Sequence, residues 1–176
     1  MKQILRAFTG ACFASLLMLS AGAVNAQTTM DEFLSKWQNS KQYTLDVLDK
    51  MPDSGMDYKT DSAAMSFKEQ IHHIANAIVG ISQGFLEGTD PGFTIDVATA
   101  SKAELAEYVS KAYDYGTATM RAVTPEKAAE DIEVFGNTVT RRQVMALILD
   151  HSTHHRGTAI AYLRINGVEP PEFVGF

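Results

Sequence analysis

Histidine is the residue type whose placement in this sequence suggests chemistry, because the five histidines fall into two clusters. His151, His154 and His155 lie within five residues near the C-terminus, and His72 and His73 are adjacent far upstream. A neutral imidazole is a common ligand of zinc, nickel, iron and copper in proteins. If the fold brings the two clusters together, the expected product is a metal site.

Four stretches of sequence predict the amphipathic helices that would position these histidines. They span residues 30–51, 67–86, 102–123 and 141–165, and apolar residues recur in each at helical spacing. A capping-box pattern precedes each stretch, with a hydroxyl residue followed three positions later by Glu or Gln. The four pairs are Thr29 and Glu32, Ser66 and Glu69, Ser101 and Glu104, and Thr140 and Gln143. Four matches of this kind strongly favour four helices.

The segments between these helices are long for a simple bundle. Residues 52–65 and 87–100 contain Pro and Gly and are expected to cover one end of the molecule. Thr124-Pro125 predicts a short extra helical turn, residues 132–139 predict a small hairpin or loop, and the tail around residues 170–173 is expected to pack back on the helices. The predicted fold is therefore all-α, a four-helix bundle with long connections.

A helical wheel at about 100° per residue indicates which histidines face inward. In the last helix His151 and His155 share a face with Val144, Leu147, Ile148, Ala159 and Tyr162, and they lie on adjacent turns. His154 lies about 60° to one side of them, as a neighbouring group. In the second helix His73 shares a flank with small residues that allow close approach of another helix, whereas His72 shares a polar flank.

His73, His151 and His155 are therefore the predicted metal ligands. Three protein ligands leave coordination positions for water or substrate, as in catalytic sites. The alternative is that these are core or surface histidines with hydrogen-bond partners. Two other metal-enzyme patterns fit poorly, because a zinc protease needs Glu where Ser152 stands and the last helix lacks the second Glu-x-x-His motif of a di-iron bundle.

The N-terminus predicts a secretory signal peptide over residues 1–26. Lys2 and Arg6 precede an apolar run that is too short for a membrane span and ends in small residues before Gln27. Residues 27–176 would then form one domain that is periplasmic or secreted, without a membrane segment and without Cys12, the single cysteine. Loss of Lys2 and Arg6 reduces 15 basic residues to 13 against 21 acidic ones, a formal net charge of −8 that disfavours nucleic-acid binding.

The last helix resembles the DinB family. The likeness rests on His151-x-x-x-His155-Arg156-Gly157, on Tyr162-Leu163-Arg164-x-x-Gly167 with Pro170-Pro171, and on His73-Ile74 and Gly136 upstream. The resemblance implies a four-helix bundle, commonly a homodimer, with a divalent metal ion on His73, His151 and His155. Zinc, nickel, iron and manganese are the candidates. The family is similar to thiol-dependent S-transferases and to isomerases that use mycothiol, which implies a small thiol cofactor.

Three hypotheses for function remain open from the sequence. The first is a metal-dependent enzyme, either a thiol S-transferase or a hydrolase that activates water for an unidentified small molecule. In it Arg156 is a candidate cofactor-binding anion clamp or else a structural ion-pair partner, and no catalytic residue is assigned. Asp150 and His154 could orient ligands, and the alternative for Asp150 is a solvated helix face. The second is a non-enzymatic periplasmic metal-binding or stress protein. The third is a dimeric bundle without metal.

Overall fold

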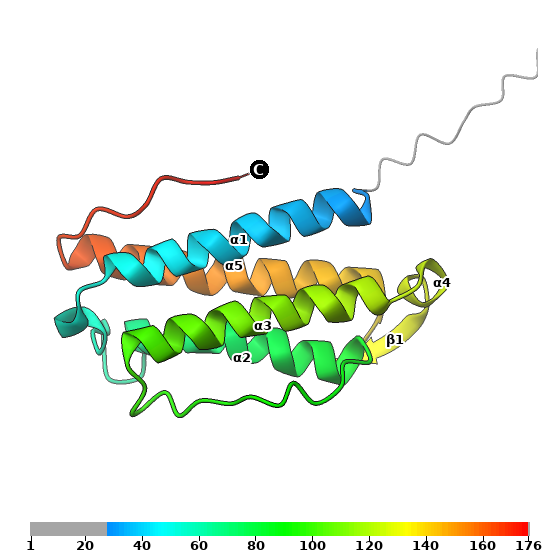
Figure 1. Cartoon of the computed structure of the whole chain (residues 1–176), viewed down its shortest axis with the longest axis horizontal. Helices are drawn as coiled ribbons and strands as arrows, with labels where there is room; N and C mark the ends of the chain where they lie inside the picture. Colours follow the sequence, from blue (N-terminus) through cyan, green and yellow to red (C-terminus); the bar gives the residue numbers. More distant parts are fainter. Residues whose placement is uncertain (1–27, 176) are drawn as a thin grey trace, which may run out of the picture.

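The computed structural model describes residues 28–175, and the predicted helical bundle is confirmed there (Figure 1). Its long helices are α1 (Met30–Lys50), α2 (Phe67–Phe85), α3 (Lys102–Ala122) and α5 (Arg141–Ile165). A short helix α4 (Pro125–Ala128) precedes a hairpin of β1 (Asp131–Val134) and β2 (Asn137–Thr140), and a 3₁₀ turn spans Asp53–Gly55. The predicted signal peptide lies outside the described residues.

All four predicted capping boxes are present. In α1, α2, α3 and α5 the hydroxyl of the cap residue accepts a hydrogen bond from the backbone three residues later, and that residue's side chain bonds back to the cap. Each pair satisfies backbone N–H groups that the first turn of a helix leaves without a partner. The helix starts are therefore determined locally, and they fall where the sequence predicts them.

The connection between α2 and α3 sets the topology of the bundle. It returns along the flank of the helices, so that α2 and α3 run in the same direction, with α1 and α5 running the opposite way (Figure 1). The Tyr115 hydroxyl donates to the Thr89 carbonyl at 2.6 Å and Phe93 packs edge-on against Tyr108, which holds this segment along α3. The expectation that residues 87–100 cover one end of the bundle is therefore wrong, because aromatic contacts along α3 hold them at its side.

The centre of the bundle is apolar and closely packed. Trp37 stacks at a tilt on Tyr113, with ring centroids 4.7 Å apart, and its indole nitrogen donates to the Tyr113 carbonyl. A Cβ atom placed on Gly116 would come within 2.9 Å of Trp37 and 3.0 Å of Ile78. Glycine at this position therefore allows α3 to approach α1 and α2 closely.

The hairpin and the tail also follow the sequence predictions. Val134 pairs with Asn137, and the two turn residues Phe135 and Gly136 have φ angles of 51° and 80°, as a tight type I′ turn requires.

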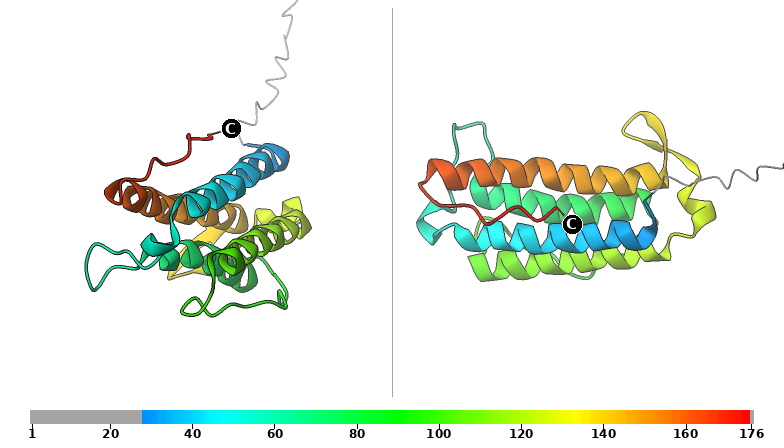
Figure 2. Two further views of the ribbon diagram at one scale, coloured as in Figure 1. Left: turned by 60° about the vertical axis from the view of Figure 1, so that its left-hand side comes forward. Right: turned by 90° about the horizontal axis from the view of Figure 1, so that it is seen from above.

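After α5 the tail runs back over the seam between α1 and α5 (Figure 2). Phe173 reaches the Tyr43 ring there, with centroids 6.0 Å apart. Among the described helices, none has a long enough apolar stretch to cross a lipid bilayer.

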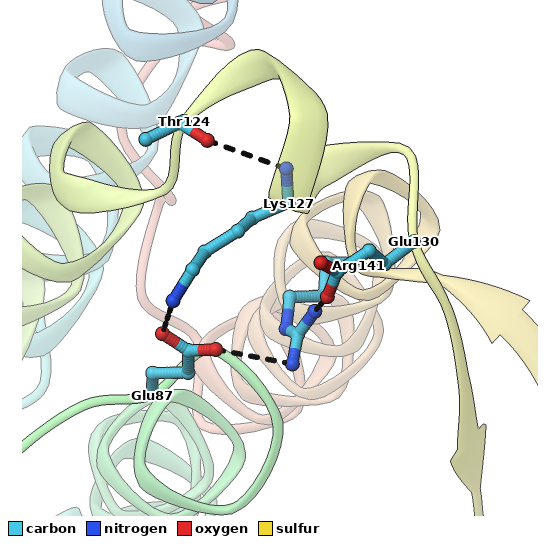
Figure 3. Close-up of polar contacts among 5 residues, drawn as sticks. All are labelled: Glu87, Thr124, Lys127, Glu130 and Arg141. Carbon is cyan, nitrogen blue, oxygen red and sulfur yellow. Dashed lines mark hydrogen bonds and ion pairs between the residues drawn. The ribbon is translucent and has the colours of Figure 1, made fainter.

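An ion-pair network ties the end of α2 to α4 and to the start of α5 (Figure 3). Glu87 bonds to Lys127 with one carboxylate oxygen and lies 3.2 Å from Arg141 with the other. Arg141 also pairs with Glu130, which precedes the hairpin. These contacts fix the end of the bundle from which α5 begins.

Candidate metal centre

Three histidines from two helices meet on one side of the bundle. His73 comes from the second turn of α2, and His151 and His155 come from successive turns in the middle of α5. One ligand nitrogen from each lies within 4.8 Å of the other two, and the ring centroids are 4.4–5.0 Å apart. The structure therefore brings together the three residues that the sequence singled out.

The histidines lie on the flank of the buried face of α5, not at its centre as the helical wheel indicated. Leu147, which the wheel placed inward, is 38% exposed, whereas Ser152 and Arg156 are buried. His151 and His155 are half-buried, one residue to the side of these two. The polar residues in the core made the helical wheel ambiguous, and the observed position leaves the imidazoles partly exposed.

The surroundings favour neutral imidazoles. Partial burial lowers the pKa of His73, and burial together with neighbouring His73 and His154 lowers that of His151. For His155, burial and then the three nearby histidines lower the pKa from 6.5 to about 4. A neutral imidazole has the free lone pair that a metal ion needs, so the cluster is in its ligand form at neutral pH.

Gln70 is a functional neighbour that the sequence reasoning missed. Its side chain is buried, and His155 Nδ1 donates to its Oε1 over 2.6 Å. A ring with its proton on Nδ1 presents the lone pair of Nε2, so this hydrogen bond sets the tautomer and the orientation of a ligand. The available signal was a glutamine next to Ile71 on the apolar face of α2, one turn before His73.

Arg156 lies in the interface between α5 and α1. It is 7% exposed, its guanidinium donates to the hydroxyls of Ser40 and Thr44 at 2.7 and 3.2 Å, and it stacks over the Tyr43 ring at 5.1 Å. None of these partners belongs to the histidine cluster. The contacts favour the structural alternative for this arginine over the anion clamp.

The other candidates surround the cluster without joining it. The His72 ring stacks on Tyr108 of α3, with centroids 5.5 Å apart, so it points away from α5. His154 is exposed, with its ring centroid 4.9 Å from that of His155, and Asp150 is exposed. Tyr162 is buried and donates to the Met65 carbonyl at 3.2 Å, which agrees with a packing role.

The three-histidine set fits a divalent metal ion. Two imidazole nitrogens on one tetrahedral zinc ion lie about 3.4 Å apart, given zinc–nitrogen bonds of about 2.1 Å. Nitrogens already within 4.8 Å reach this spacing by small side-chain rotations. The three rings are only partly buried, so the cluster lies near the surface of the bundle.

The fold and the site together define a four-helix bundle that carries a three-histidine cluster between antiparallel helices. The DinB family model matches residues 24–175, so this chain belongs to the DinB family. The protein YjoA of Bacillus subtilis strain 168, which is uncharacterized, is 25% identical over 145 residues, covering 78% of this chain and 90% of YjoA.

Solved structures of DinB-like proteins share the fold. The crystal structure of YjoA has a TM-score of 0.67 at 21% identity, covering 82% of this chain and 99% of YjoA. A DinB-like protein from Bacillus cereus ATCC 10987 has a TM-score of 0.71 at 18% identity, with 83% and 98% coverage. YfiT from Bacillus subtilis has a TM-score of 0.63 at 17% identity, with 82% and 93% coverage, and is described as a probable metal-dependent hydrolase with an unusual four-helix bundle topology.

Proposed function

We propose that this protein is an exported metal-dependent hydrolase in which His73, His151 and His155 hold one divalent ion. The observation that carries the proposal is the convergence of three ligand nitrogens within 4.8 Å, from side chains that are only half-buried. The likeness to YfiT, a probable metal-dependent hydrolase, supports hydrolysis as the class of reaction.

The residues around the cluster have separate roles in this proposal. A divalent ion supplies a Lewis acid that lowers the pKa of water and polarises a substrate carbonyl or phosphoryl oxygen. Gln70 orients His155 from the protein interior. His154 stands at the solvent side of the cluster, where an imidazole could accept or release a proton.

Metal analysis of protein purified without a histidine tag tests the site. We expect about one divalent ion per chain, lost on His155→Ala substitution because one of three ligands is removed. His72→Ala is the matched control, since His72 lies on the same helix turn as His73 but faces α3. A chain that holds no stoichiometric metal, and whose melting temperature is unchanged by a chelator, would contradict the proposal.

Activity assays separate the hydrolase from the alternatives. The metal-loaded protein is screened with ester, amide and phosphoester substrates, and with electrophiles in the presence of several small thiols. Metal-dependent hydrolysis that His155→Ala abolishes supports the proposal. Turnover only with a thiol would assign an S-transferase, and stoichiometric metal without turnover in either screen would assign metal binding alone.

Export and dimerisation belong to the proposal as well. Cleavage before Gln27 would leave the domain of residues 27–176, in the periplasm or secreted. N-terminal sequencing of the protein recovered from cells checks the cleavage site, and light scattering of the same material checks for the homodimer. An intact Met1 in the recovered protein would contradict export.

A further inference from the structure

A cavity lies at the end of the bundle where α5 begins. It has a volume of about 530 Å³ and is enclosed by the start of α1, the end of α3, α4 and the first turns of α5. Figure 1 shows these four segments converging at the end marked by α4. Pockets that hold small molecules commonly have volumes of about 300–1,000 Å³. None of the three clustered histidines lines this cavity, so it is separate from the metal centre.

The lining is apolar and adaptable. Phe33, Met30, Met120 and Met145 contribute side chains to it, and Met120 and Met145 are at most 2% exposed. The cavity therefore reaches from the surface into the core. Methionine is unbranched and polarizable, and it adapts to flexible apolar ligands better than branched side chains do.

Two arginines stand at the cavity, Arg121 in the last turn of α3 and Arg142 in the first turn of α5. Arg121 and Arg142 are exposed, and neither forms an ion pair with a carboxylate of residues 28–175. The neighbouring Arg141, by contrast, is bound by both Glu87 and Glu130. In a protein with more acidic than basic residues, two guanidinium groups that no carboxylate of residues 28–175 pairs with make the surroundings of this cavity locally positive.

The position of Arg142 adds to this local positive charge. The first turn of α5 contains no acidic residue, although the first turns of α1, α2, α3 and α4 all do. A cation at the N-terminal end of a helix is unfavourable because the backbone amides there carry partial positive charge. An anion bound at Arg142 would relieve this repulsion.

We propose that this cavity binds an amphiphilic anion, a ligand with a flexible apolar chain and one acidic head such as a carboxylate. The head pairs with Arg121 and Arg142, and the chain enters among Phe33 and the methionines. Arginine suits a carboxylate because its planar fork can donate two parallel hydrogen bonds. The apolar lining excludes small hydrophilic anions as the preferred ligand.

Titration calorimetry with the protein as recovered from expression of the full chain tests the site. Octanoate is compared with 1-octanol and with octyltrimethylammonium, which share the chain but differ in the charge of the head. We expect octanoate to bind at least tenfold more tightly than either. Substitution of both arginines by glutamine, R121Q with R142Q, should remove this preference and leave octanol binding unchanged.

Matched variants distinguish octanoate binding in this cavity from binding elsewhere on the protein and from loss of folding. Arg164→Gln removes an exposed arginine from the last turn of the same helix and should leave octanoate affinity unchanged. His155→Ala removes a ligand of the metal centre and should also leave it unchanged. Ala146→Phe places a ring at the cavity wall and should weaken all chain ligands, with the circular dichroism melting curve showing that the variant remains folded.

Three results would overturn the proposal. One is the absence of saturable binding of octanoate, and another is equal affinity for octanoate and octanol. The third is occupation of the cavity by protein. That is shown if Ala146→Phe dissociates a dimer, or if a photocrosslinker at position 146 captures residues before Thr28.

Discussion

Gln70 and Arg156 are buried polar side chains, and each has hydrogen-bond partners that indicate its role. Gln70 accepts from His155 Nδ1, and Arg156 donates to Ser40 and Thr44 across the α1–α5 interface. A buried polar group without partners costs free energy, so such residues are informative about local function. One positions a candidate metal ligand and the other joins two helices.

Substitution of Gln70 tests the positioning of His155. Gln70→Leu keeps the approximate size of the side chain but removes the acceptor, so His155 is no longer held with Nε2 free. We expect the metal affinity to fall by about 10–100-fold, the usual effect of losing such a partner. Gln70→Glu retains an acceptor and should bind metal at least as tightly as the wild type. Chelator competition measures both affinities, and equal affinities for the leucine and glutamate variants would contradict the role.

Substitution of Arg156 tests the structural role of the buried guanidinium. Arg156→Ala leaves a cavity between α1 and α5 and removes the hydrogen bonds to Ser40 and Thr44. We expect the free energy of unfolding to fall by about 2–4 kcal/mol, as for other large truncations in a core. Urea denaturation measures this loss, with exposed Arg164→Ala as the control. Unchanged stability with lost ligand binding would instead favour an anion clamp.

At the scale of elements, α5 carries two of the three histidines and its start is fixed by the network around Glu87. Glu87 has a φ of 60°, a left-handed conformation that glycine adopts readily and other residues do not. The side chain therefore stabilises this end of the bundle through its ion pairs while its backbone is strained. The two effects act in opposite directions and can be separated by substitution.

Two substitutions of Glu87 separate the ion pairs from the strain. Glu87→Ala loses the contacts to Lys127 and Arg141 and retains the strain, whereas Glu87→Gly loses the contacts and relieves it. Both variants should be less stable than the wild type at low salt, and the glycine variant should unfold at a higher urea concentration than the alanine variant. High salt should reduce the difference in the free energy of unfolding between the wild type and Glu87→Gly, because salt screens exposed ion pairs. An alanine variant as stable as the glycine variant would exclude the strain.

At the scale of the whole molecule, the bundle holds the histidine cluster between antiparallel helices, beside a core that is mostly apolar. Folding therefore places several imidazoles in partly buried positions even before a metal binds. Such groups make stability depend on pH, because the unfolded chain binds protons that the folded protein does not. This dependence is a property of the complete fold and not of any one helix.

Acidification of the metal-free protein should lower its stability. His155 has a pKa near 4 when folded, against 6.5 in the unfolded chain. The unfolded state therefore gains a proton first, and the free energy of unfolding should fall as the pH decreases from 6.5 to 4. Urea denaturation across this range measures the slope. His155→Gln should reduce the slope of the free energy of unfolding against pH. Identical slopes in the two proteins would show that His155 does not contribute to the pH dependence of stability.

The helix starts could be predicted from the sequence because capping is a local interaction. The family could be recognised because the motif that carries the resemblance is a short run of residues in α5. Capping boxes such as Ser66 with Glu69 and Thr140 with Gln143 satisfy the first backbone amides of a helix within four residues. The i, i+4 spacing of His151 and His155 likewise places both on one side of α5 without reference to any other element. The contrast between the flanks of α2 was enough to choose His73 over His72.

The sequence by itself determined four capped helices and which histidines share a helix face, because these follow from short-range spacing and hydrogen bonding, and it left a hairpin or a loop open after α3. Only the tertiary structure decided that residues 87–100 return along α3, that Gln70 bonds to His155, and that Arg156 is buried against α1. Each of these depends on contacts between residues far apart in the chain. Their partners are set by the packing of helices against one another, which local patterns leave open.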